Sequence, residues 1–338
     1  MNRHGFIVSP TGDLGATFNP AAAKFDDGRY VLLVRSVPAG YEKIGPVNSF
    51  TGNYTSHISL WDAQSPTGPF KLLDEKAIAP DQPFDQYGAE DPRITKVGDT
   101  YYIFYTSIAK PLDQPDAGDG IRIAMASTKD FKTFEKHGTI GPDRRCKAGL
   151  VFETTGNLFF MWKDEQVHER TMLTPLPKNF DIKDVKAWEN FWTGRDIEKD
   201  LLLGAGGKHE GLGVEPGAPP IEIEEGLLLA YSSISSDFNW TISLLLLDKN
   251  DPTKILAKSA KPMLRPEMDY ELKGDVNNVV FPCGAVIDDD RLYVYYGGAD
   301  KICAVASESM DDVKSALGLP VSKADSAHKK LSSEGHKP

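Results

Sequence analysis

Several features are scarce in this 338-residue sequence, and each scarcity excludes a class of protein. The three cysteines, Cys146, Cys283 and Cys303, are widely spaced and form no CxxC pair, which favours reduced, buried thiols over a disulfide scaffold. No run of about 18 apolar residues occurs, so no membrane span is predicted. The net charge of −11 leaves no basic stripe for phosphate backbones, so nucleic acid is not an expected partner.

The amino-terminal residues also lack a recognisable targeting signal. Their sequence, MNRHGFIVSP, contains no apolar core of the kind that a signal peptide requires. The chain as given is therefore expected in the cytoplasm, although a chain already trimmed of its signal would look the same. An acidic protein of this kind suits a neutral ligand.

A pattern that recurs five times is the main positive signal. Each copy is a Gly- or Asp-bearing turn followed by a short aromatic or aliphatic run that ends in polar residues. The copies lie at residues 27–35, 98–106, 156–164, 226–232 and 290–300. Spacings of about 58 to 70 residues suit a four-stranded antiparallel sheet better than a helical repeat. The sequence therefore predicts an all-β fold, a five-bladed β-propeller, with the polar strand ends gathered around one central pocket.

The remaining segments agree with a single domain. Further strands bounded by polar turns follow four of the repeats, at 57–62, 121–127, 242–248 and 302–307. One helix is predicted, from Met310 to Leu317, with Asp311 and Asp312 favourably placed in its first turn. No linker divides residues 1–320, which we expect to form one domain. Residues 321–338 are polar and small, and are predicted to be a flexible tail.

An acidic cluster precedes the second repeat. Glu90, Asp91 and Arg93 place two carboxylates and a guanidinium within four residues, and Pro92 favours extended backbone at Asp91. Taken alone, such residues usually form a surface salt-bridge cluster. Their position at the entry to a core strand instead favours a place at the pocket.

Ten short blocks, in order along the chain, resemble the signature blocks of glycoside hydrolase family 130. They are Phe18–Ala21, Leu32–Arg35, Gly88–Ile94, Pro219–Ile221, Asp251–Pro252, Pro266–Glu267, Tyr270–Glu271, Gly274, Asn278–Gly284 and Tyr295–Asp300. The resemblance implies a five-bladed propeller that acts on β-mannosides, in most members by inverting phosphorolysis and in a smaller group by hydrolysis. The blocks extend over nearly the whole chain apart from its tail.

The resemblance also implies roles for individual residues. Asp91 matches the catalytic acid, and its neighbours Glu90 and Arg93 would shift its pKa in opposite directions. Asn19, Arg35 and Asp300 match residues that hold the mannose at the reacting position, and Phe281 belongs to a matching block. Further candidates for binding the substrate are Glu90, Arg93, Lys163, Glu210, Tyr231 and Phe281. Asn19, Arg35 and Asp300 also have plain structural readings, as a turn residue, a salt bridge and a strand cap.

The positions expected to bind phosphate depart from the pattern of the phosphorylases. Where similar phosphorylases carry a Lys and a Tyr-His pair, this chain has Glu222 and Tyr231-Ser232. A carboxylate would repel phosphate, and Glu222 could activate water instead. At the third repeat, either Lys163 or Asp164 stands where phosphorylases carry an Arg; the first would keep a phosphate contact and the second would add a base.

Two further groups of residues deserve weighing. The Gly-rich loop 204–217 carries Glu210 and Glu215, each a candidate second base or hydroxyl-binding residue, but its spacing fits no metal motif, and we predict neither a metal nor a cofactor. The aromatic residues Tyr87, Trp192, Phe238 and Trp240 are candidates for stacking on sugar rings, although most propeller aromatics belong to the core.

The sequence thus favours an inverting, exo-acting β-mannosidase that uses water on a mannose-containing oligosaccharide, with β-1,2 linkages preferred. Asp91 would be the acid, Glu222 the leading base and Asp164 a partner. The first alternative is a mannoside phosphorylase. The second is a non-catalytic glycan-binding propeller, which the intact Asp91 block disfavours. Association into a homo-oligomer is compatible with the sequence.

Overall fold

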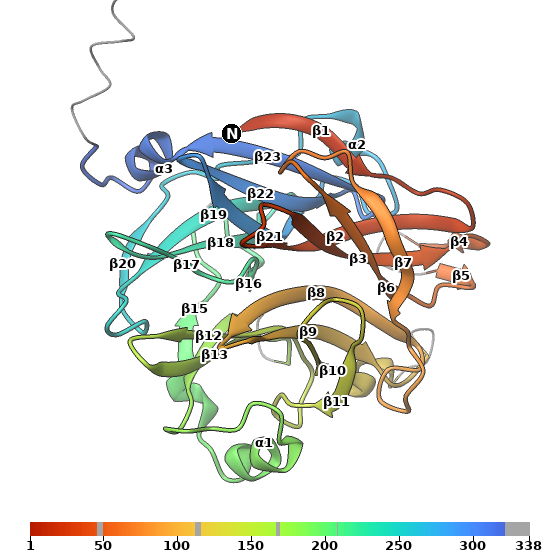
Figure 1. Ribbon diagram of the computed structural model, residues 1–338, viewed down its shortest axis with the longest axis horizontal. Helices are drawn as coiled ribbons and strands as arrows, with labels where there is room; N and C mark the ends of the chain where they lie inside the picture. The colour runs from red at the N-terminus through yellow and green to blue at the C-terminus, as the bar shows by residue number, and fades with distance from the viewer. Residues whose placement is uncertain (46–49, 112–115, 167–169, 208, 322–338) are drawn as a thin grey trace, which may run out of the picture.

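Five antiparallel sheets surround a central axis in the computed structural model, which describes residues 1–45, 50–111, 116–166, 170–207 and 209–321 (Figure 1). The prediction of a five-bladed β-propeller is confirmed. All five repeated runs form the second strand of a blade, namely β3, β9, β13, β18 and β22. The expected tail, residues 321–338, lies outside the described part of the chain apart from its first residue.

The first three blades follow the chain in order. Blade 1 contains β2 (Leu14–Lys24), β3 (Tyr30–Pro38), β6 (His57–Ala63) and β7 (Lys71–Ile78), with a small hairpin, β4 (Tyr41–Lys43) and β5 (Phe50–Gly52), between β3 and β6. Blade 2 contains β8 (Gly88–Val97), β9 (Thr100–Ile108), β10 (Ile121–Thr128) and β11 (Glu135–Thr139), with a short 3-10 helix η1 (Ala117–Gly120) before β10. Blade 3 contains β12 (Cys146–Thr154), β13 (Asn157–Asp164), β14 (Arg170–Pro175) and β15 (Leu201–Leu203).

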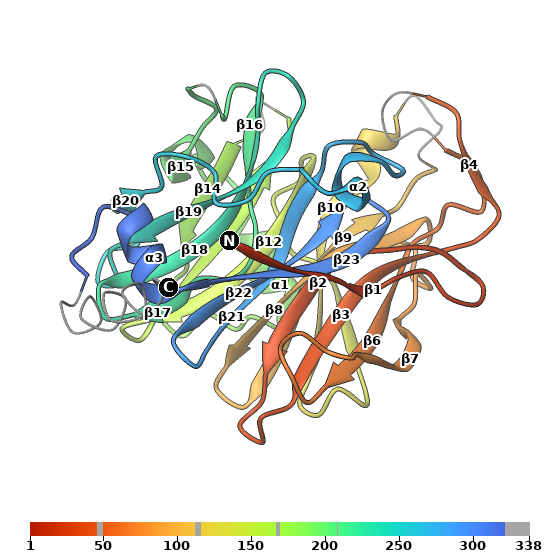
Figure 2. The same ribbon diagram turned by 90° about the horizontal axis from the view of Figure 1, so that it is seen from above.

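Two further blades complete the ring. Blade 4 contains β16 (Gly213–Pro216), β18 (Gly226–Ile234), β19 (Trp240–Leu247) and β20 (Ile255–Lys258), and β17 (Ile221–Ile223) pairs with the start of β18. Blade 5 contains β21 (Val280–Asp288), β22 (Arg291–Gly298), β23 (Ile302–Ser309) and, as its outermost strand, β1 (Asn2–Val8). The first strand of the chain therefore closes the ring on the last, as Figure 2 shows.

Burial follows the order of the strands within each blade. The second strands β9 and β18 are buried along their whole length, because they face neighbouring blades on both sides, whereas the outer strand β7 is exposed at most positions. Such strands read as continuous apolar runs, which is how the sequence revealed them. All three cysteines are buried and free of disulfides, as predicted.

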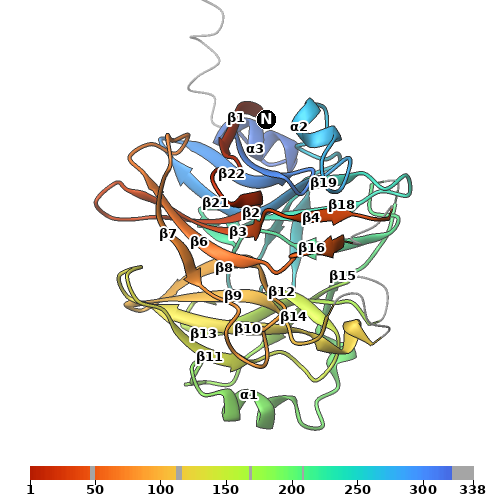
Figure 3. The same cartoon turned by 90° about the vertical axis from the view of Figure 1, so that its right-hand side faces the viewer.

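Helices are short and peripheral. The predicted C-terminal helix is confirmed as α3 (Met310–Ala316), while α2 (Asp269–Leu272) is a single turn and η2 (Ile197–Asp200) is a 3-10 turn. The sequence reading missed α1 (Val185–Trp192), which is capped by Asp184 through the backbone N–H of Lys186 and packs the buried Trp188 against Phe160 of β13. Figure 3 shows this helix at the edge of the molecule, next to β11. None of the helices in the described ranges has the length and apolarity needed to cross a membrane.

The ring closure is reinforced by an ion pair between a partly buried arginine and a buried carboxylate. Arg3 on β1 donates from Nε to Oε1 of Glu271 at 2.8 Å and from Nη2 to the carbonyl of Arg265 at 2.6 Å. The Glu271 side chain is fully buried and also accepts a hydrogen bond from the hydroxyl of Tyr296. Pairing with Arg3 therefore compensates a carboxylate that would otherwise be costly to bury.

Replacing Arg3 by Ala should lower the free energy of unfolding by about 2–4 kcal/mol, because Glu271 would stay buried without its cation. Urea unfolding followed by circular dichroism measures this change. Lys129→Ala is the matched control: it removes the pair with Asp99, whose side chains are 66% and 79% exposed, and should cost below about 0.5 kcal/mol. Equal losses in the two variants would show that Arg3 does not stabilise the closure.

Candidate active site

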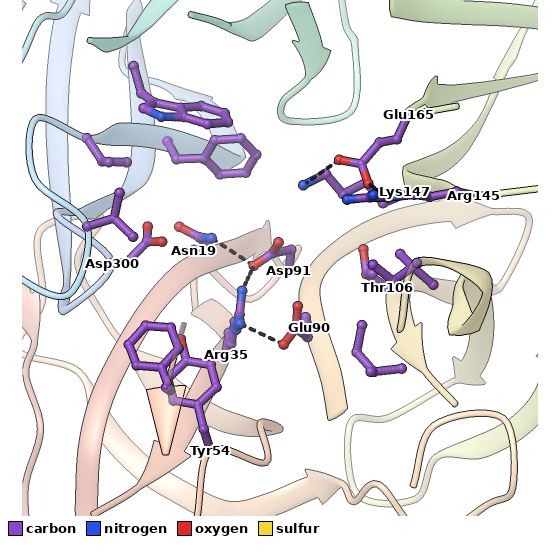
Figure 4. A pocket seen from close by; sticks show the side chains of 18 residues that line it. Asn19, Arg35, Tyr54, Glu90, Asp91, Thr106, Arg145, Lys147, Glu165 and Asp300 are labelled. Atoms are coloured by element: carbon purple, nitrogen blue, oxygen red, sulfur yellow. Dashed lines mark hydrogen bonds and ion pairs between the residues drawn. The ribbon is translucent and has the colours of Figure 1, made fainter. Parts of the chain in front are cut away.

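One cavity of about 350 Å³ opens at the end of the propeller where the inner strands begin. All five blades or their connecting loops contribute to its lining: Asn19 and Arg35 from blade 1, Glu90 and Asp91 from blade 2, Lys147 from blade 3, Trp240 from blade 4, and Phe281 and Asp300 from blade 5. The sequence prediction of a central pocket that joins distant polar strand ends therefore describes this place. Figure 4 shows its side chains.

Irregular pairing of the inner strands sets the direction of these side chains. The ladders shift register between Phe18 and Ala21 in β2, between Glu90 and Arg93 in β8, and between Lys147 and Leu150 in β12. Bulges of this kind bend a strand and redirect a side chain. At two of them Asn19 and Asp91 have φ angles of 51° and 49°, a left-handed conformation that Asn and Asp adopt more readily than most residues. The expectation of extended backbone at Asp91 is therefore wrong.

Asp91 is held from two sides at the floor of the cavity. Its Oδ1 accepts a hydrogen bond from Asn19 Nδ2 at 2.7 Å and one from Arg35 Nη1 at 3.1 Å. Arg35 also donates from Nη2 to Glu90 Oε1 at 2.6 Å, so one guanidinium orients both carboxylates (Figure 4). Gly297 makes room for Asn19, because a Cβ at that position would lie 2.1 Å from Asn19 Oδ1.

These contacts separate the pKa values of the two neighbouring carboxyl groups. Burial raises the pKa of Asp91, but the charges of Arg35 and Lys147 and the bond from Asn19 outweigh it and leave the pKa below its ordinary value. Burial and the charge of Asp91 raise the pKa of Glu90 despite Arg35. In the free protein Asp91 therefore loses its proton more readily than Glu90 does.

A third carboxyl group, Asp300, completes this side of the cavity. Burial, together with the negative charges of Asp91 and Asp275, raises its pKa to about 7 against the opposing charge of Arg35. A carboxyl group that is protonated near neutrality can donate as well as accept a hydrogen bond. It is therefore suited to holding a sugar hydroxyl.

A cationic cluster lies on the other side of the cavity from Asp300 (Figure 4). Glu165 accepts from Arg145 Nε at 2.9 Å and pairs with Lys147 Nζ at 3.0 Å and Lys163 Nζ at 3.2 Å. Behind this wall, the buried carboxylate of Glu215 accepts a hydrogen bond from Lys163 Nζ at 2.7 Å. Burial alone would lower the pKa of Lys147. The negative charges of Glu165, Glu215 and Asp91 outweigh this effect and raise the pKa, so Lys147 remains a cation. The wall thus presents two cations, Arg145 and Lys147, and one carboxylate to a ligand.

Glu222 does not lie in this cavity, and the prediction that it faces the central pocket is wrong. It is exposed on β17, opposite Leu227 at the start of β18. The cavity borders the other end of this blade, where β18 ends and Trp240 begins β19. Consecutive antiparallel strands run the full height of a blade, so a residue beside the start of β18 lies far from its end.

Asp164 is also displaced from its expected place. It is fully buried and pairs with Arg144 Nε at 3.1 Å and Arg170 Nη2 at 2.9 Å, outside the cavity lining. The next residue, Glu165, lines the cavity instead. Successive residues point in opposite directions near a strand end, so the choice between neighbours could not be made from the sequence.

Four expected substrate contacts point elsewhere. Arg93 is buried and donates to the carbonyls of Pro216 at 2.7 Å and Gly217 at 2.9 Å, which ties blade 2 to blade 4. Lys163 lies behind the wall with Glu215, outside the cavity lining. The Tyr231 hydroxyl donates to Glu210 at 2.5 Å, and Glu210 lines a separate recess beside Lys258. These placements correct the expected contacts of Arg93, Lys163, Tyr231 and Glu210.

The predicted aromatic contacts divide in the same way. Trp240 and Phe281 line the cavity, whereas Tyr87 and Phe238 are exposed beyond it. Trp192 donates to the carbonyl of Ile140, which follows β11 of blade 2. The sequence reading missed Phe50, Tyr54, Arg145 and Lys147 as lining residues. Arg145 and Lys147 could have been found, because they enter blade 3 where Glu90 and Asp91 enter blade 2. No cluster of metal-ligating residues occurs among the residues that the structure describes.

Asp300→Asn should change how stability depends on pH. The folded chain holds the Asp300 proton up to a pKa of about 7, whereas the ordinary value is 3.8, so ionisation of Asp300 costs folding free energy as pH rises between these values. The variant escapes this cost. Its unfolding free energy relative to the wild type should therefore increase between about pH 4 and pH 7, by roughly 1–4 kcal/mol. Urea unfolding at several pH values tests this, and parallel profiles would contradict it.

Comparisons with known proteins agree with this geometry. The sequence model of a family described as beta-1,4-mannooligosaccharide phosphorylase matches residues 8–317. A 1,2-beta-oligomannan phosphorylase of Thermoanaerobacter sp. (strain X514) is 31% identical over 300 residues, which are 88% of this chain and 92% of the relative. Its length and coverage make it a relative of the whole propeller.

Solved structures share the same fold at lower identity. The β-1,2-mannobiose phosphorylase of Listeria innocua, in complex with β-1,2-mannobiose, superposes with a TM-score of 0.77 at 23% identity and covers 94% of this chain and 99% of its own. A second structure, from work on glycoside hydrolases of this family that target β-1,2 mannosidic linkages in Candida mannan, has a TM-score of 0.70 at 23% identity, with 91% and 93% covered. The family match and the sequence relatives together show that the chain belongs to glycoside hydrolase family 130.

Proposed function

We propose that the protein is a β-mannoside phosphorylase, which cleaves its substrate with inorganic phosphate and releases mannose 1-phosphate with inversion. The observation that carries the proposal is the pair of cations, Arg145 and Lys147, in the cavity wall near Asp91. Phosphate needs no base but does need cationic groups to hold it. The earlier preference for water depended on Glu222 as a base in the pocket, and Glu222 is exposed on β17 at the far end of its blade.

The reaction assigned to this site transfers one proton and exchanges one bond. Asp91 gives its proton to the glycosidic oxygen, the bond from C1 of the mannose to that oxygen breaks, and a phosphate oxygen bonds to C1 from the opposite face. Asn19 and Arg35 fix the acid, while Asp300 is placed to hold a mannose hydroxyl.

Phosphate would also help to protonate the acid. In the free protein Arg35 and Lys147 help to hold the pKa of Asp91 below its ordinary value. A phosphate dianion beside Lys147 offsets that positive charge and raises the pKa of Asp91. Asp91 would thus gain its proton as the nucleophile binds, which suits an acid that acts only in the complete complex.

Hydrolysis is the second candidate, because the carboxylate of Glu165 lines the cavity and is the nearest replacement for the expected base. Its environment argues against that role. Burial alone would raise the pKa of Glu165, but the positive charges of Lys147, Lys163 and Arg145 lower this pKa well below its ordinary value. A carboxylate that is stabilised this strongly accepts a proton from water poorly.

The linkage and the sugar of the proposed substrate are taken from the names of the relatives. The Thermoanaerobacter and Listeria enzymes are named for β-1,2-linked mannosides, so we propose a β-1,2-linked manno-oligosaccharide as the substrate here. The expected homo-oligomer stays a prediction.

Incubation with β-1,2-mannobiose should release mannose 1-phosphate at a rate that rises with inorganic phosphate and saturates. Ion chromatography of the products, with and without phosphate, measures this. Free mannose as the sole product at an unchanged rate would establish hydrolysis and overturn the proposal.

Glu165→Gln separates the two reactions by the direction of its effect. For a phosphorylase the change removes a competing negative charge, so the KM for phosphate should fall. For a hydrolase it removes the base, and turnover should drop by about 10² or more. Lys147→Met is the companion variant: loss of a charge-assisted bond to phosphate should raise the KM for phosphate about 10- to 100-fold.

Asp91→Asn should lower turnover of β-1,2-mannobiose by about 10²–10⁴ because the leaving sugar needs a proton. An aryl β-mannoside with an acidic leaving group should lose much less. Steady-state rates on the two substrates give the comparison, with circular dichroism to check folding. An equal loss on both would show that Asp91 acts other than as the proton donor.

A further inference from the structure

The hairpin formed by β4 and β5 has a role that the proposed chemistry does not yet include. It leaves blade 1 between β3 and β6, and β4 lies at the edge of the molecule in Figures 1 and 2. Phe50 on β5 and Tyr54 just beyond it both line the cavity. Their rings stack in parallel, with centroids 3.8 Å apart and planes 2° apart, and Tyr41 on β4 packs edge-on against both.

Three side chains fasten this hairpin to blade 5, and we call Tyr41, Asp275 and Lys301 the latch. The hydroxyl of Tyr41 donates to the carboxylate of Asp275. Lys301 Nζ donates to the Tyr41 hydroxyl at 2.8 Å and to Asp275 Oδ1 at 3.2 Å. Lys301 follows the cavity residue Asp300, and Asp275 precedes the cavity residue Val276. The latch therefore fixes the aromatic wall relative to the sugar-binding side.

The position of this wall follows from the order of the blades. In a ring of five, the boundary between blades 1 and 5 lies opposite blade 3, which carries Arg145 and Lys147. Figure 4 likewise places Tyr54 away from the cationic cluster. An inverting reaction needs its nucleophile and leaving group on opposite faces of the reacting carbon. If phosphate binds at blade 3, the leaving sugar departs toward the latched hairpin.

We propose that the leaving sugar binds against Phe50 and Tyr54, and that the latch positions these two rings for it. The proposal rests on the proposed function, which sets the side of the nucleophile. Aromatic rings suit the C–H faces of a pyranose. Tyr54 adds a polar contact, because its hydroxyl has no hydrogen-bond partner within the described part of the chain and can bond a sugar hydroxyl. Phe50 and Tyr54 are thus specificity residues, and Tyr41 is a positioning residue.

The test uses the reaction in both directions on the full-length chain. Phe50→Ala should raise the KM for β-1,2-mannobiose in phosphorolysis and the KM for the acceptor mannose in synthesis, each by about 3- to 10-fold. The KM values for phosphate and for mannose 1-phosphate should stay within about twofold. Tyr54→Phe keeps the ring and removes the hydroxyl. It should raise the same two KM values by a smaller factor and leave the KM values for phosphate and mannose 1-phosphate unchanged.

Tyr41→Phe tests the latch, because it keeps the packing of the ring and removes only the hydroxyl that joins Asp275 and Lys301. It should raise the acceptor KM while leaving the KM for mannose 1-phosphate unchanged. Phe6→Ala, at an aromatic residue that is 60% exposed on β1, is the control and should change neither. A merely structural role for Tyr41 would lower the melting temperature without splitting the two KM values.

Three outcomes would overturn the inference. They are an unchanged acceptor KM in Phe50→Ala, an equal rise for acceptor and mannose 1-phosphate, and a split reproduced by Phe6→Ala. The proposed function fails separately, if the wild type forms no mannose 1-phosphate. In that case water replaces phosphate on the same face, and Phe50→Ala must still raise the KM for β-1,2-mannobiose.

Discussion

The buried guanidinium of Arg35 is the interaction on which the arrangement of the cavity depends. Among the residues that the structure describes, it alone hydrogen-bonds to both Glu90 and Asp91, and its Cζ lies 4.5 Å from the centroid of the Phe18 ring. Three carboxyl groups, those of Glu90, Asp91 and Asp300, share this space, and burial disfavours their ionised forms. Without the cation, the carboxylates would repel one another and take up protons. With it, the pKa of Asp91 stays below its ordinary value, while the pKa of Asp300 is about 7.

The bulged inner strands explain how a propeller can build such a site. A regular strand would send alternate side chains into neighbouring blades and leave the axis to backbone. The irregularities after Phe18, Glu90 and Lys147 turn Asn19, Asp91 and their neighbours toward the axis at one level. Arg93, buried between Asp91 and blade 4, supports this geometry from behind. The site therefore rests on backbone features that repeat from blade to blade.

Residue patterns predicted the propeller architecture better than they predicted which residues line the cavity. The repeated apolar runs reveal β3, β9, β13, β18 and β22, because strands buried on both faces need no polar alternation. Asn19, Arg35 and Asp91 were found through motif blocks on β2, β3 and β8, and Asp300 through the block that ends just after β22. Glu222 was misplaced, because nothing in its neighbourhood shows which end of a blade a short edge strand will join. Glu165 was missed in favour of Asp164, since a shift of one residue reverses the side to which a strand end points.

Ring closure by β1 has a consequence for how the molecule forms. Arg3 contacts Glu271 across 268 positions of sequence, and β1 pairs with β23, the last strand of the chain. Contacts between residues this far apart in sequence cost loop-closure entropy before they stabilise the fold, and they slow folding. During synthesis on a ribosome, β1 must therefore wait, unpaired, until β23 has been made. The first four blades can assemble in the order of their synthesis, but the fifth is completed only when β1 meets β23.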